Sequence, residues 1–90
     1  MALNKGYILK KLGNEYMIIK INDGSVNVTK TFNINETGAI IFNGLKDNLT
    51  KDEITKNIIN EFNIDYDTAY NDVFEFISIL KEKGIYNDWY

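Results

Sequence analysis

The 90-residue sequence contains no Cys, His, Arg or Pro, and all ten of its basic residues are Lys. Without Cys and His it has no ligands for the usual zinc sites, and it lacks the Cys nucleophiles and His general bases of the commonest acyl-transfer machinery. Without Arg it lacks the forked side chain that proteins favour for phosphates and guanine edges. We therefore expect a protein that is not an enzyme and that uses no metal or cofactor.

The charge balance argues against polyanionic partners. Thirteen acidic residues against ten basic ones give a net charge of −3, whereas binding to nucleic acid or an anionic membrane favours a basic surface. No signal peptide and no long apolar run are visible. With 44% apolar residues, we expect residues 1–90 to form one cytoplasmic, stand-alone domain with a single small core.

The first third of the sequence predicts three strands, over about residues 7–12, 15–21 and 26–32. Asp23 and Gly24 separate the last two strands, and this pair tolerates the positive φ angles of a type I′ hairpin turn. The short connections predict an antiparallel meander. Its third strand alternates, with Val26, Val28 and Phe32 on one face.

The rest of the sequence predicts three helices, over about residues 36–43, 51–62 and 66–83. The expected fold is α+β: a three-stranded antiparallel sheet followed by a three-helix bundle (βββααα), similar to a winged helix with its sheet placed first. In the second helix, Ile54, Ile58 and Phe62 form the apolar stripe that would face the core.

Local signals mark the helix ends. Asn35 and Asp65 are suited to cap the first and third helices, and Thr50 with Glu53 forms a capping box for the second. Gly44 is expected to stop the first helix. Gly84 is expected to end the third, with Ile85 folding back on Leu80.

The third helix carries two neighbouring apolar stripes. One is a core stripe made of Ala69, Val73, Phe76, Ile77 and Leu80. The other contains Tyr70, Phe74 and Ile77 and is continued by Lys81. The second stripe either belongs to the core or lines a groove at the margin of the core.

Two functions suit this architecture: DNA binding through a recognition helix, and peptide binding by addition of a strand to the sheet. The third helix and its lead-in carry five acidic residues, which would repel a phosphate backbone. The third strand has no Pro and only Lys30 as a charge, so its edge is open to another strand unless the N-terminus or a dimer partner covers it. Strand addition is therefore the favoured function, with a DNA-binding regulator as the alternative.

An enzymatic alternative would use acidic residues. Asp65, Asp67 and Asp72 could form a carboxylate cluster for Mg²⁺. The simpler interpretation is that Asp65 caps the helix and that the acidic side chains interact with the helix dipole.

Two segments resemble the PqqD-like proteins, which are RiPP recognition elements. Residues 34–39, Ile-Asn-Glu-Thr-Gly-Ala, match the family's start of the first helix. The third helix matches at Asp72, Val73, Phe76, Ile77, Leu80, Gly84 and Ile85. The resemblance covers about residues 7–86.

The resemblance implies a stand-alone protein that binds the leader of a ribosomally made precursor peptide and presents it to a radical SAM enzyme, a protease or a cyclase. The pathway could make PQQ, a lasso peptide or a sactipeptide. The leader is expected to add antiparallel to the third strand, in a monomer or in an edge-paired or domain-swapped dimer, without nucleic acid or membrane. The expected contacts are Val26, Asn27, Val28, Thr29, Lys30 and Thr31 of the strand, and Tyr70, Phe74, Ile77 and Lys81 of the helix.

Overall fold

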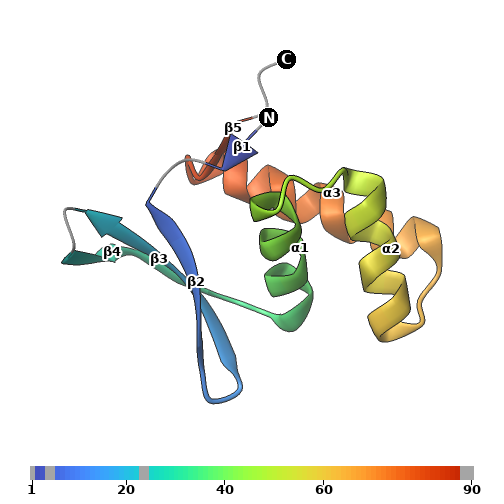
Figure 1. The fold of residues 1–90 in the computed structure, drawn as a ribbon, viewed down its shortest axis with the longest axis horizontal. Helices are drawn as coiled ribbons and strands as arrows, with labels where there is room; N and C mark the ends of the chain where they lie inside the picture. Colours follow the sequence, from blue (N-terminus) through green and yellow to red (C-terminus); the bar gives the residue numbers. More distant parts are fainter. Residues whose placement is uncertain (1, 4–5, 23–24, 88–90) are drawn as a thin grey trace.

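The computed structural model describes residues 2–3, 6–22 and 25–87; for residues 2, 22, 25–31 and 87 it describes the backbone alone. Figure 1 shows α1 lying between the sheet and the other two helices. The strands are β1 (Ala2–Leu3), β2 (Tyr7–Leu12), β3 (Glu15–Asn22), β4 (Ser25–Ile34) and β5 (Tyr86–Asn87), and the helices are α1 (Glu36–Lys46), α2 (Lys51–Phe62) and α3 (Tyr66–Glu82). The predicted βββααα order is confirmed.

Two antiparallel sheets are present in the described part of the chain. One has the order β2-β3-β4, as the meander prediction requires. The other joins β1 to β5, so that the first and last described strands lie side by side (Figure 1). The predicted turn at Asp23 and Gly24 lies outside the described residues.

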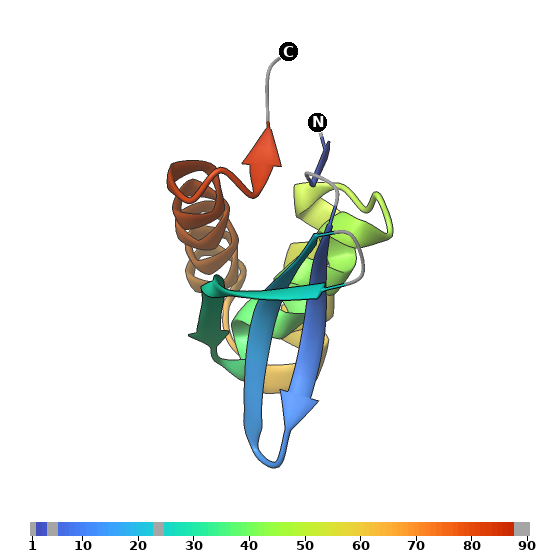
Figure 2. The same cartoon turned by 90° about the vertical axis from the view of Figure 1, so that its left-hand side faces the viewer.

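Strand β4 is interrupted by a large bulge. Its last part pairs Phe32 with Ile18, and its first part pairs Asn27 with Lys20. One residue of β3 therefore lies opposite the four residues 28–31 of β4, three more than a regular ladder allows. Figure 2 shows β4 changing direction along its length.

The predicted caps are confirmed. Asn35 Oδ1 accepts from the Gly38 amide at 2.7 Å, and Asp65 accepts from the Thr68 amide at 3.1 Å. The capping box is complete, because the Glu53 amide donates to Thr50 Oγ1 at 3.1 Å and Glu53 Oε1 accepts from the Thr50 amide at 2.9 Å.

The end of α3 also follows the prediction. Gly84 has φ +74°, a left-handed conformation that suits glycine at this position. The amide of Ile85 donates to Leu80 O at 2.9 Å and that of Gly84 to Lys81 O at 3.1 Å, which is the Schellman arrangement. Ile85 is thereby turned into the core, where it is 1% exposed.

The end predicted for α1 is wrong, because the helix passes through Gly44 and continues to Lys46. Gly44 is buried against α2. A Cβ at this position would lie 2.5 Å from Cγ1 of Ile54, a side chain with no exposed surface. The glycine therefore permits close packing of two helices and does not end one.

The core joins the helices to one face of the sheet. Ile18 of β3 belongs to one buried cluster with Phe42 of α1 and with residues of α2, α3 and β5. The expected stripe positions Ile54, Ile58 and Val73 are fully buried. No helix in the described part of the chain is long and apolar enough to cross a membrane.

Candidate functional site

A groove runs between the end of β4 and α3. One wall consists of Phe32, Asn33, Ile34 and Asn35. The other consists of Phe76 and Ile79 of α3 and of Lys83, the C-cap residue of that helix. A pocket of about 220 Å³ adjoins it and shares Asn35, Phe76 and Ile79 with it. Together the two hollows form one continuous surface, here called the β4–α3 groove.

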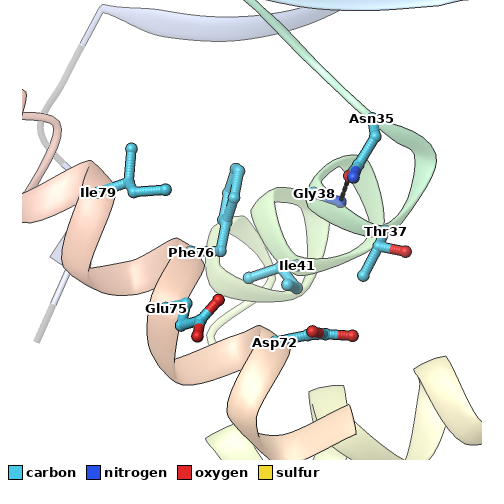
Figure 3. A pocket seen from close by; sticks show the side chains of 8 residues that line it. All are labelled: Asn35, Thr37, Gly38, Ile41, Asp72, Glu75, Phe76 and Ile79. Carbon is cyan, nitrogen blue, oxygen red and sulfur yellow. Dashed lines mark hydrogen bonds between the residues drawn. The ribbon is translucent and has the colours of Figure 1, made fainter. Parts of the chain in front are cut away.

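The adjoining pocket extends the groove along α1 (Figure 3). Its lining adds Thr37, Gly38 and Ile41 from α1 and Asp72 and Glu75 from α3.

Glycine at position 38 sets the position of the aromatic ring in this groove. A Cβ on Gly38 would lie 2.8 Å from Cε1 of Phe76, so only a residue without a side chain leaves the ring where it is. Figure 3 shows the Phe76 ring between Gly38 and Ile79. The Gly38 amide also donates to the Asn35 cap, which holds the first turn of α1 against the groove.

One edge of β4 has no neighbouring strand among the described residues. β4 pairs with β3 only, and the N-terminal strand β1 pairs with β5 and does not cover β4. Val26 and Asn27 pair with β3, whereas residues 28–31 form the bulge. The site predicted along Val26–Thr31 therefore lies on a bent edge strand, and only its backbone is described.

The structure brings none of the four predicted helix residues into the lining of this groove. Ile77 is 2% exposed and belongs to the core. Phe74, Tyr70 and Lys81 are exposed, but none of them lines either hollow of the groove. Successive helix residues are rotated by about 100°, so Phe74 lies on the opposite flank of α3 from Phe76.

The flank that carries Tyr70 faces α2. The Tyr66 hydroxyl donates to Asp52 of α2 at 2.7 Å, and the rings of Tyr66 and Tyr70 stack with centroids 5.9 Å apart. The hydrogen bond from Tyr66, followed by that from Lys56, lowers the pKa of Asp52, and the same carboxylate raises the pKa of Tyr66. These contacts link two helices at the surface.

Sequence reasoning missed Ile79 and Lys83 as residues of the groove and assigned Phe76 to the core. Ile79 is 43% exposed, whereas Phe76 is half-buried. Lys83 Nζ lies 4.7 Å from the ring centroid of Phe32 and so reaches from α3 to β4. The four-residue spacing between Ile79 and Lys83 was a signal in the sequence, although it could not show which flank meets the sheet.

The alternative carboxylate cluster does not form. Asp65 accepts hydrogen bonds from Thr68, which lower the pKa of its carboxyl group, and Asp72 lies in the groove beside Glu75. No group of three acidic side chains in the described part of the chain is placed to hold a metal ion.

An open sheet edge beside a groove with an apolar middle is the arrangement that peptide-binding domains use when a peptide adds a strand to their sheet. Residues 15–85 match the family described as coenzyme PQQ synthesis protein D (PqqD), and this match covers most of the chain. The chain therefore belongs to the PqqD family. No curated protein sequence matches it.

Two solved structures share the fold. The first, TbiB1 in complex with the TbiA(beta) leader peptide, has a TM-score of 0.75 and 21% identity over 98% of this chain and 100% of that chain. The second, lasso peptide synthetase B1 complexed with the leader peptide, has a TM-score of 0.72 and 18% identity over 92% of each chain. The alternative of a DNA-binding regulator gains no support from these comparisons.

Proposed function

We propose that this protein binds the leader segment of a ribosomally made precursor peptide as a strand added to β4. Membership of the PqqD family supports this function, and so do two structures of the same fold described with leader peptides. The observation that carries the proposal is the open edge of β4 beside the β4–α3 groove. The protein's own contribution is recognition, without a chemical step.

The backbone and the groove have different tasks. Hydrogen bonds to the β4 backbone can form along the predicted residues Val26–Thr31 and onward to Ile34. Each contributes about 0.5–1.5 kcal/mol and does not depend on the side chains of the leader. Selectivity comes from leader side chains that cover Phe76 and Ile79. The sequence predicted contacts at Tyr70, Phe74 and Lys81. We propose instead that the leader contacts Phe76, Ile79 and Lys83, because these residues line the groove.

The bound leader requires a second protein to act on it. We propose that this partner is a peptide-modifying enzyme, such as a radical SAM enzyme, a leader protease or a cyclase. The fold supports such an adaptor role because a peptide held at the edge of β4 keeps its remaining length outside the domain.

The decisive experiment compares two apolar residues on opposite flanks of α3. Ile79→Gln and Phe74→Gln both replace an exposed apolar side chain, one inside the groove and one outside. The probe is a synthetic peptide covering the N-terminal part of a candidate precursor, chosen from the short open reading frames next to this gene, and its affinity is measured by calorimetry. Since Ile79 is 43% exposed, covering it contributes about 1 kcal/mol, so Ile79→Gln should weaken binding about five-fold.

The matched variant Phe74→Gln should bind like the unmodified protein. If Phe74→Gln weakens binding and Ile79→Gln does not, the peptide lies on the other flank of α3. Val28→Pro removes one backbone donor from β4 and tests the strand itself. An unchanged affinity in both Val28→Pro and Ile79→Gln would rule out strand addition at β4.

A further inference from the structure

The two ends of the β4–α3 groove carry opposite charges. Asp72 and Glu75 line the end that faces α1, and Lys83 lines the other end beside Phe32. Phe76 and Ile79 belong to both hollows, and along the chain they lie between Glu75 and Lys83. Figure 3 shows them beside Asp72 and Glu75. An acidic end, an apolar middle and a basic end form a surface that distinguishes one direction along a bound strand from the other.

We propose that the groove selects a peptide whose side chains follow the order basic, apolar, acidic from its N-terminus to its C-terminus. The inference rests on the proposed strand addition to β4, taken in the antiparallel sense, and names the class of leader that this site takes. A Lys or Arg of the peptide would meet Asp72 and Glu75, and an Asp or Glu would meet Lys83.

The order follows from the direction of the chain. β4 runs from Phe32, beside Lys83, to Ile34 and then to Asn35, which lines the acidic pocket. A strand added antiparallel to β4 runs the opposite way. Its earlier residues therefore lie at the acidic end of the groove and its later residues at the basic end.

Helix geometry gives the spacing between the two charges. Glu75 and Lys83, the C-cap residue of α3, are eight residues apart, a distance of about 12 Å at 1.5 Å per residue. An extended peptide covers this distance in about four residues. Because alternate side chains share a face, the basic residue, the apolar residue and the acidic residue would stand at positions i, i+2 and i+4.

A basic side chain suits the acidic pocket better than an anion does. The carboxylates of Asp72 and Glu75 carry two full charges, and neither makes a hydrogen bond or ion pair with another described side chain. The start of α1 contributes only about half a positive charge, its Gly38 amide is already bonded to Asn35, and Glu36 lies in the same turn. At about 220 Å³, the pocket is smaller than small-molecule sites of roughly 300–1,000 Å³ and matches a single long side chain.

The test uses peptides of identical composition. A library of random 12-residue peptides is selected on the immobilised full chain, and two synthetic peptides are then compared by calorimetry. One carries the core Lys-Ser-Leu-Ser-Glu and the other the reversed core Glu-Ser-Leu-Ser-Lys. Reversing the core turns two exposed charge pairs from attraction to repulsion. The first peptide should therefore bind about ten-fold more tightly than the second.

The double variant Glu75→Lys/Lys83→Glu keeps the net charge and should invert this preference. The control Lys10→Glu/Glu61→Lys makes the same exchange at exposed positions outside the groove and should leave the preference unchanged. Selected peptides should show the basic, apolar, acidic order with the i, i+2, i+4 spacing.

The outcomes separate this inference from the proposed function. If Ile79→Gln weakens the selected peptides but they show no charge order, or the reverse order, the inference is overturned and strand addition stands. A preference that the Glu75→Lys/Lys83→Glu exchange fails to invert also overturns it. If no selected peptide is sensitive to Ile79→Gln or Val28→Pro, the proposed function fails and the inference fails with it.

Discussion

Gly44→Ala is expected to destabilise this protein, although the same change stabilises most helices. In an ordinary helix interior, alanine is favoured over glycine by about 1 kcal/mol. Here the new methyl group would lie 2.5 Å from Cγ1 of Ile54, a side chain that has no exposed surface and belongs to the packed core. Overpacking of this kind costs about 1–3 kcal/mol, so we expect a net loss of about 1 kcal/mol.

If this explanation is right, Gly44→Ala should become stabilising when the neighbouring Ile54 is made smaller. Ile54→Ala should cost about 2–5 kcal/mol because it leaves a cavity between α1 and α2. In that background, the methyl group of Gly44→Ala fills part of the cavity and keeps its helix preference. Adding it should therefore raise the free energy of unfolding by about 1 kcal/mol.

Urea denaturation followed by far-UV circular dichroism measures all four proteins of this cycle. In a domain of this size, 1 kcal/mol also shifts the melting temperature by about 4–8 °C. Stabilisation by Gly44→Ala in the unmodified protein would show that α1 and α2 are not closely packed at this point. Additive effects of the two changes would lead to the same conclusion.

Two further predictions concern the groove and the acid range. Gly38→Ala should push the half-buried Phe76 ring into the groove. The free energy of unfolding should stay within about 1 kcal/mol of that of the unmodified protein, but calorimetry should show weaker binding of the precursor-derived peptide. Unchanged binding would contradict the role of Gly38. The hydrogen bonds from Thr68 lower the pKa of Asp65 from its ordinary value of 3.8, so they stabilise the fold above that pH and are lost as the pH falls through the lowered value. Urea denaturation is measured at neutral pH and at pH values below 3.8. Between the two, Asp65→Asn, which does not titrate, should lose less free energy of unfolding than the unmodified protein; equal losses in both proteins would refute this.

Local interactions explain why much of the fold could be predicted from the sequence. The caps at Asn35, Thr50 and Asp65 each join residues three positions apart, so their geometry depends on the adjacent chain alone. The Schellman ending at Gly84 is equally local. The end of α1 was not predictable in this way, because Gly44 acts through a contact with α2.

Which flank of α3 meets the sheet is also decided by packing. The helix is apolar around much of its circumference, and its sequence favoured the aromatic pair Tyr70 and Phe74 for the groove. The structure brings Phe76 there because Gly38 of α1 leaves room for its ring. A contact between residues 38 positions apart has no counterpart in the periodicity of either helix.

The pairing of β1 with β5 was the feature of the fold that the sequence could predict least. Each strand has two residues, too few to show alternation, and the pair joins Leu3 to Tyr86 across the whole chain. Burial of Tyr86 to 2% exposure fixes this end of the chain against the core.

The bulge in β4 has a consequence for self-association. A long, straight edge strand is a template on which identical chains can stack into aggregates. Because β4 bends at residues 28–31, a second copy of the same edge could follow only a short stretch before the two backbones diverge. Under the proposed function, the irregular ladder therefore leaves the edge of β4 open to a short peptide while disfavouring the stacking of identical chains.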